Sequence, residues 1–194
     1  MNPPNQSASP VLLPTAPLFI IGYRGTGKTV VAKLLAQRLS WQSIDADELL
    51  QSRQGRTISQ IFTEQGEAAF RDMEAALLTE LCSLEKHVIA TGGGVILRPE
   101  NRQRIRDAGT VIWLKANAAT IWHRLQEDTA TANQRPALTV GGLEEIKELL
   151  KARAPLYQEC ANLTVDTAGQ TPEDVVEEII GAVQKRLGAG GPKT

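Results

Sequence analysis

The chain has 194 residues, of which 42% are hydrophobic and 22% charged, so it is long enough to bury the core of a single globular domain. Its 21 lysines and arginines nearly balance its 22 aspartates and glutamates, which gives a formal net charge of -1. This balance excludes the overall basic excess that binding to nucleic acid or to an anionic membrane would use. An acidic small-molecule partner would therefore have to be bound by a few local arginines.

The two ends of the chain differ in composition from the middle. Residues 1–16 are rich in Pro, Ser and Asn, and the chain closes on GAGGPKT, so we expect flexible tails at 1–16 and 189–194 around one domain at 17–188. No apolar run is long enough to span a bilayer, and Cys82 and Cys160 lack the spacing of a zinc site. We therefore expect a cytoplasmic monomer with two free thiols and no membrane or nucleic-acid partner.

Between the tails, short apolar runs alternate with stretches of helical period. The strand candidates in chain order are PLFIIG (17–22), a short strand that ends at SID (43–45), HVIATGGG (87–94), TVIWLKA (110–116) and NLTVDT (162–167). The helix candidates cover residues 28–40, 67–81, 101–109, 117–126, 143–159 and 171–188. Alternation of strand and helix predicts an α/β fold in three layers, with a parallel sheet covered by helices on both faces.

The segment EDTATANQRPALTVGG, residues 127–142, interrupts this alternation. It is polar, contains Pro136, ends in two glycines and shows no period. A loop of this length inside a compact domain is usually either functional or disordered.

The first strand candidate leads into GYRGTGKT, residues 22–29, which matches the phosphate-binding pattern G-x-x-x-x-G-K-[S/T] between a strand and a helix. Glycines let backbone N–H groups surround an anion, the lysine reaches the β- and γ-phosphates, and the threonine hydroxyl can bind Mg²⁺. The alternative is a glycine-rich turn that matches by chance. The ATP-binding residues we expect here are Gly22, Gly25, Thr26, Gly27, Lys28, Thr29 and Val30.

Two carboxylates follow the second strand candidate. Asp45 and Asp47 are two residues apart, so in an extended strand they would point the same way. One could support Mg²⁺, and the other could reach the group that attacks the γ-phosphate. The alternative is that Asp47 caps a helix that begins at ELLQSR.

Further along, the chain contains FRDMEAALL, ATGGGVIL, QRPALT and RAPLYQECA. Together with the phosphate loop and the D-A-D segment, in this order and spacing, they resemble shikimate kinases from residue 18 to about 186. The resemblance implies transfer of a phosphoryl group from MgATP to shikimate, giving ADP and shikimate 3-phosphate on the route to aromatic amino acids. It also implies a P-loop kinase fold with a five-stranded parallel sheet and a mobile lid, here at 127–142.

The resemblance also assigns residues to the acceptor. Arg71 and Arg153 would bind the shikimate carboxylate, and Asp47 would orient the attacking hydroxyl. For either arginine alone, a solvated position on a helix surface is the alternative. Glu74 lies three residues after Arg71 on a helix and could hold it in place. The full set of substrate-binding residues is Asp47, Arg71, Glu74, Gly92, Gly93, Gly94 and Arg153.

For the transferred phosphoryl group, the resemblance implies that Lys28 and Arg135 neutralise the developing charge, and that Thr29 and Asp45 bind Mg²⁺. The catalytic residues are then Lys28, Asp47 and Arg135, and Arg135 also contacts ATP. Many shikimate kinases carry a second arginine seven positions before this one, where this chain has Asp128.

Two other functions share the phosphate loop. A gluconate kinase would have the same fold. It should not need two arginines and a triple glycine suited to a carboxylated ring. A nucleotide-binding regulator would sense ATP without chemistry, which the intact Lys28, Asp47, Arg71 and Arg135 argue against.

Overall fold

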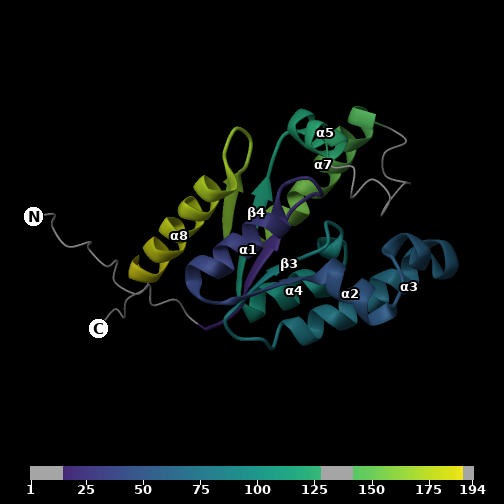
Figure 1. The fold of residues 1–194 in the computed structure, drawn as a ribbon, viewed down its shortest axis with the longest axis horizontal. Helices are drawn as coiled ribbons and strands as arrows, with labels where there is room; N and C mark the ends of the chain where they lie inside the picture. The colour runs from purple at the N-terminus through teal and green to yellow at the C-terminus, as the bar shows by residue number, and fades with distance from the viewer. Residues whose placement is uncertain (1–14, 128–141, 190–194) are drawn as a thin grey trace, which may run out of the picture.

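The computed structural model describes residues 15–127 and 142–189. They contain a five-stranded parallel sheet of order β2-β3-β1-β4-β5, which confirms the predicted α/β fold (Figure 1). The strands are β1 (Leu18–Ile21), β2 (Gln42–Asp45), β3 (His87–Ala90), β4 (Thr110–Lys115) and β5 (Leu163–Asp166). The helices are α1 (Lys28–Leu39), α2 (Ala46–Gln54), α3 (Ile58–Leu81), α4 (Pro99–Ala108), α5 (Ala118–Glu127), α7 (Gly142–Cys160) and α8 (Pro172–Ala189), with a short 3-10 helix, η1, at Val95–Leu97.

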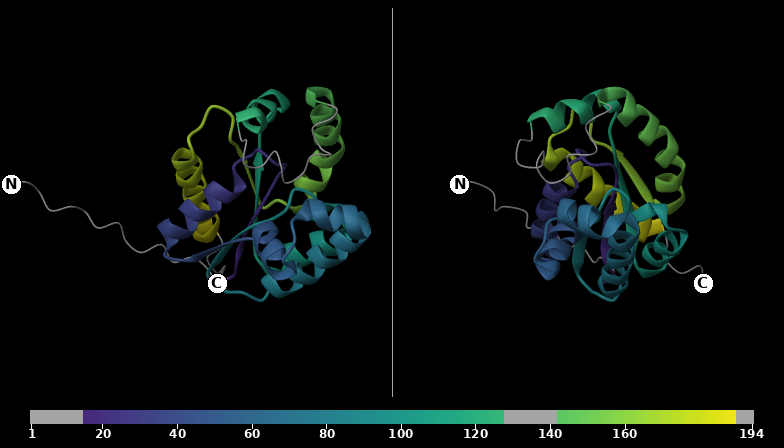
Figure 2. Two further views of the ribbon diagram at one scale, coloured as in Figure 1. Left: turned by 45° about the vertical axis from the view of Figure 1, so that its right-hand side comes forward. Right: turned by 90° about the vertical axis from the view of Figure 1, so that its right-hand side faces the viewer.

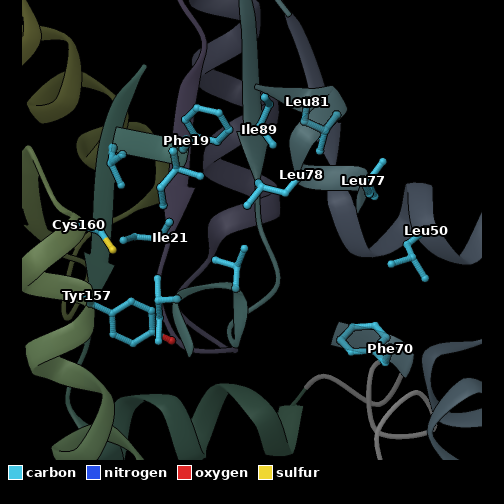
Figure 3. Packing of buried hydrophobic residues seen from close by; sticks show 14 of the residues in the cluster. Phe19, Ile21, Leu50, Phe70, Leu77, Leu78, Leu81, Ile89, Tyr157 and Cys160 are labelled. Atoms are coloured by element: carbon cyan, nitrogen blue, oxygen red, sulfur yellow. The ribbon is translucent and has the colours of Figure 1, made fainter. Parts of the chain in front are cut away.

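Side chains of the central strands point alternately to two separate cores. Phe19 and Ile21 of β1 pack against residues of α2, α3, α4 and α7, as Figure 3 shows for part of this cluster. Leu18 and Ile20 pack on the other face against α1 and α8. Because both of its faces are covered, the central strand β1 is apolar throughout instead of alternating with polar residues. Figure 2 shows the helices on either side of the sheet.

Local sequence signals explain where the helices begin and end. Thr57 and Gln60 form a capping box at the start of α3, and Gly66 interrupts this element with φ 82° and ψ 170°. Only the part after Gly66 corresponds to the helix predicted at 67–81. The preceding turns, which begin at Ile58, were not predicted, although the T-x-x-Q pattern that caps them is present in the sequence.

All five strands run in parallel, so their carboxyl ends lie at one edge of the sheet. β1 pairs with both β3 and β4, and Asp45 at the end of β2 is in register with Ala90 at the end of β3. The loops after β1, β2 and β3 therefore start side by side. In open parallel sheets this edge is where ligands bind.

Several predictions concern parts of the chain outside the described residues. The tails lie almost wholly in 1–14 and 190–194, and the lid lies almost wholly in 128–141. Their boundaries therefore stay predictions. Within the part of the chain that is described, no helix is long and apolar enough to cross a membrane.

Gly109 joins α4 to β4 where the backbone of residue 17 passes closely. A Cβ atom at Gly109 would lie 2.0 Å from the carbonyl oxygen of Pro17, although the backbone at Gly109 is extended and suits any residue. We expect Gly109→Ala to lower the free energy of unfolding by roughly 1–3 kcal/mol, because backbone must shift to relieve the overlap. Chemical denaturation would measure the change.

The matched control is Gly181→Ala in α8, where a Cβ atom would meet no atom within 4 Å. This change should leave stability unaltered or raise it by up to ~1 kcal/mol, because alanine favours helix more than glycine does. Equal destabilisation by both variants would contradict the steric explanation.

Candidate active site

The phosphate-binding loop joins β1 to α1 at the carboxyl edge of the sheet. Gly25 and Gly27 have φ values of 75° and 88°, a region that favours glycine. Gly27 is the N-cap of α1, so the loop presents the free N–H groups of a helix N-terminus to the space above it. Such a terminus with its surrounding amides is suited to binding phosphate.

Two side chains of the loop donate hydrogen bonds to the same carbonyl oxygen. The Lys28 ammonium lies 2.9 Å from the oxygen of Tyr23, and the Thr26 hydroxyl lies 2.7 Å from it. These bonds tie the end of the loop back to its beginning and fix the position of the Lys28 side chain.

A cleft of about 760 Å³ opens over this loop. It extends from the loop to the start of α2 on one side and to the turn after β5 on the other. The residues that line it include Gly25, Gly27, Lys28, Thr29, Asp45, Asp47, Thr91, Arg124, Thr167 and Gln170. All the predicted loop residues except Gly22 line this cavity together with both aspartates, and the cavity is large enough for a nucleotide.

Asp45 connects the loop to α2. Its Oδ2 accepts a hydrogen bond of 2.6 Å from the Thr29 hydroxyl, and its Oδ1 accepts from the backbone N–H groups of Asp47 and Glu48. Asp45 is thus the N-cap of α2, and Asp47 lies in the first turn of that helix. The expectation that the two aspartates project alike from one strand was wrong, because the strand ends at Asp45 and the helix starts directly after it.

The Thr29 hydroxyl and the Asp45 carboxylate are hard oxygen ligands at the mouth of the loop. They fit an octahedral Mg²⁺ ion that takes its other ligands from phosphate oxygens and water. Among the described residues, no group of three or more His, Cys, Asp or Glu side chains is placed to hold a metal ion.

The glycine segment after β3 contacts a different neighbour at each position. A Cβ atom at Gly92 would lie 2.8 Å from Asp47 Oδ1 and 2.8 Å from Glu74 Oε1, and one at Gly94 would lie 2.5 Å from the Arg71 guanidinium nitrogens. At Gly93, a Cβ atom would lie 3.4 Å from the carbonyl oxygen of Gly22 in the phosphate loop. Larger residues at Gly92 and Gly94 would displace Asp47, Glu74 and Arg71, so close approach explains these two glycines.

Arg71 lies on α3 between two carboxylates. It donates to Glu74 at 2.8 Å and to Glu67 at 3.1 Å, which confirms that Glu74 holds this arginine. Its side chain and that of Glu74 are largely buried, at 14% and 9% exposure. Burial lowers the pKa of Arg71, but the charges and hydrogen bonds of Glu74 and Glu67 outweigh this effect and raise the pKa overall.

Arg153 lies on α7, with its guanidinium carbon 5.7 Å from the centre of the Tyr23 ring. One helical turn later, the buried Tyr157 stacks on Trp113 and donates a hydrogen bond of 2.6 Å to the carbonyl oxygen of Gly93. Burial raises the pKa of Tyr157, and the charge of Arg153 offsets part of the rise. α7 therefore fixes the glycine segment and places Arg153 next to the phosphate loop.

Arg124 on α5 was not predicted as a site residue. It donates to the oxygen of Gly25 at 3.3 Å and to the hydroxyl and carbonyl oxygens of Thr167 at 3.0 and 2.7 Å, so it ties the phosphate loop to the turn after β5. A second arginine therefore does border the cleft, four positions before Asp128. Arg124 lies within a helix and outside any recognised motif, so nothing in the sequence except its charge marked it as a site residue.

Arg135 and Asp128 lie outside the described residues, so their predicted positions are not established here. The turn after β5 contributes Thr167 and Gln170 to the lining of the cleft.

Known proteins share this sequence and fold. A family model described as shikimate kinase matches residues 24–184. The shikimate kinase of Rhodopirellula baltica is 40% identical over 172 residues, which cover 88% of this chain and 92% of that protein. A solved shikimate kinase from Acinetobacter baumannii, in complex with shikimate, has a TM-score of 0.82 at 32% identity and covers 91% of this chain and 96% of that one.

The alternative of a gluconate kinase receives support from the fold alone. A gluconokinase from Sinorhizobium meliloti has a TM-score of 0.56 at 17% identity, over 89% of this chain and 93% of that chain. The family match, in contrast, covers the phosphate loop from Arg24 onward, the glycine segment and both arginines predicted to bind the acceptor. The chain therefore belongs to the shikimate kinase family, and its activity is the ATP-dependent phosphorylation of shikimate in the biosynthesis of aromatic amino acids.

Proposed function

We propose that ATP binds in the large cleft, with its phosphates in the loop at 22–29, and that shikimate binds beside it between Asp47, the glycine segment and the two arginines. The position of Asp47 is the observation that supports this arrangement. Asp47 lines the nucleotide cleft and also lies against Gly92, next to Glu74. It therefore stands where the acceptor would meet the γ-phosphate.

On the phosphate side, the backbone amides of the loop and the N-terminus of α1 would bind the β- and γ-phosphates. When ATP binds, the Lys28 ammonium would give up its hydrogen bond to the Tyr23 carbonyl oxygen and donate to the phosphate oxygens instead. Its long, flexible side chain allows this change of partner. The Thr29 hydroxyl and the Asp45 carboxylate would hold Mg²⁺. When bound, the ion neutralises charge on the β- and γ-phosphates.

On the acceptor side, the oxygen of a shikimate hydroxyl forms a bond to the γ-phosphorus while the bond from that phosphorus to the β,γ-bridging oxygen breaks. This transfer has a loose transition state that depends on alignment more than on a strong base. Asp47 would accept a hydrogen bond from the attacking hydroxyl and take its proton late in the step. Arg71 and Arg153 would bind the carboxylate, which fixes the ring.

Three further assignments are proposals based mainly on the sequence. Arg135 would neutralise charge on the transferred group, as the resemblance implies. The protein would act as a monomer. It would be cytoplasmic, a location in keeping with the free thiols of Cys82 and Cys160, because reducing compartments keep thiols unpaired.

Lys28→Ala and Asp47→Asn should each reduce kcat by ~10²-fold or more, because both side chains act on the reacting groups. A coupled assay of ADP release, with shikimate, quinate and gluconate compared as acceptors, would measure this. Neither side chain fills the core, so thermal unfolding should change little. Turnover near that of the unmodified protein in either variant would contradict the catalytic role of the replaced residue. Turnover with gluconate alone would contradict the assignment of shikimate as the acceptor.

Arg124→Ala should raise the KM for ATP by about tenfold and leave the KM for shikimate nearly unchanged, because it removes hydrogen bonds that join the phosphate loop to the turn after β5. Steady-state kinetics with each substrate varied in turn would test this. Arg106→Ala is the matched control, since Arg106 is exposed on α4, away from the cleft. A rise confined to shikimate would contradict the placement of ATP.

Arg71→Ala and Arg153→Ala should each raise the shikimate Kd, by on the order of 30-fold or more, and alter the ATP Kd little, since each loses a charged partner of a bound carboxylate. Their effects on stability should differ. Arg71→Ala removes a cation that pairs with the buried Glu74 and should destabilise the fold by roughly 3 kcal/mol, whereas Arg153→Ala removes no ion pair with a carboxylate of the described residues. Calorimetric titration and thermal unfolding would separate the two effects, and loss of ATP binding alone would overturn the assignment.

A further inference from the structure

The two arginines assigned to the acceptor carboxylate are held in opposite ways. Arg71 lies between the carboxylates of Glu74 and Glu67. Arg153 has no carboxylate within ion-pairing distance in the described part of the chain, and the ring of Tyr23 lies against its guanidinium group.

This difference determines where positive charge is available. Around Arg71, one cation faces two anions, so an incoming carboxylate meets no excess of positive charge from this group. An aromatic ring attracts a guanidinium through its π face and leaves the N–H donors at the guanidinium edge unused. For a substrate carboxylate, Arg153 therefore keeps its charge, its Nε–H and the donors that its hydrogen bond with Tyr157 does not use.

Tyr23 is held firmly at both ends. Its backbone carbonyl accepts hydrogen bonds from Lys28 and Thr26. Its ring is buried, with 3% exposure, in a small cluster with Ile121 of α5 and Ile146 of α7. The Tyr23 hydroxyl has no hydrogen-bond partner among the described residues. The contact with Arg153 is therefore made by the ring and not by the hydroxyl.

We propose that Tyr23 is a positioning residue for the acceptor, whose ring holds Arg153 in place, and that Arg153 supplies the positive charge that no carboxylate of the described residues offsets, while Arg71 contributes hydrogen bonds to the substrate carboxylate. The inference rests on the proposed function, which places the shikimate carboxylate at Arg71 and Arg153. It assigns a role in acceptor binding to a residue of the nucleotide loop.

Replacing the ring tests this directly. Tyr23→Leu should raise the KM for shikimate by about tenfold with little change in the KM for ATP, whereas Tyr23→Phe, which keeps the ring, should stay within about threefold of the unmodified protein. Ile146→Ala loosens the same cluster but keeps both the Tyr23 ring and Arg153, and should leave the KM for shikimate unchanged. Equal increases in both KM values for Tyr23→Leu would show that Tyr23 only shapes the phosphate loop, which would overturn the proposal.

A double-mutant cycle separates this inference from the proposed site. In an Arg153→Ala background, Tyr23→Leu should have no further effect on shikimate, and the effect should also vanish for the neutral carboxamide analogue of shikimate. An effect of Tyr23→Leu that persists without Arg153 would reject the role of Tyr23. If Arg153→Ala alone leaves shikimate binding intact, the proposed site itself fails.

Should Tyr23→Leu not fold, the electronic character of the ring provides a second measurement. Phenylalanine analogues with increasing numbers of ring fluorines, incorporated at position 23, keep the ring but progressively weaken its negative π face. The KM for shikimate should rise stepwise with fluorine number while the KM for ATP stays constant. A flat series would overturn the proposal.

Discussion

The active site depends on close contact between two backbone segments, the phosphate loop after β1 and the glycine segment after β3. β1 and β3 are neighbours in a parallel sheet, so their carboxyl ends lie about 5 Å apart. The loops remain close beyond the strands, since a Cβ atom built at Gly93 would lie at van der Waals distance, 3.4 Å, from the oxygen of Gly22. Tyr157 then fixes Gly93 through its carbonyl oxygen. A donor phosphate on one segment and an acceptor on the other are thereby brought together without any long side chain between them.

Most of the fold could be predicted because its signals are local. Apart from β2, the strands contain short apolar runs, and the helices that cover them repeat apolar residues at helical spacing. The turns of α3 that begin at Ile58 were missed although Ile58, Ile61 and Phe62 follow helical spacing, because this segment is short and Gly66 separates it from the predicted helix. The position of Asp47 was also missed. A strand and a helix that meet at Asp45 without a loop leave no break in the sequence to mark the change.

The site could be predicted only where its residues fall within motifs. The phosphate loop and the Arg71–Glu74 pair follow from spacing along one segment, and the structure has both. Arg124 and the contact of Arg153 with Tyr23 join segments that are far apart in the sequence. No spacing rule relates such residues, so they emerge only when the sheet edge brings α5, α7 and the phosphate loop together.

Asp45 links the chemistry of the two halves of the site. One oxygen of its carboxylate accepts from Thr29 in the nucleotide loop, and the other caps the helix that carries Asp47. The N-cap fixes where α2 begins, and the first turn of α2 fixes where Asp47 lies. The distance between the proposed metal ligands and the group that orients the acceptor is therefore set by a single carboxylate. Phosphoryl transfer depends on this alignment, since its transition state gains more from positioning than from base strength.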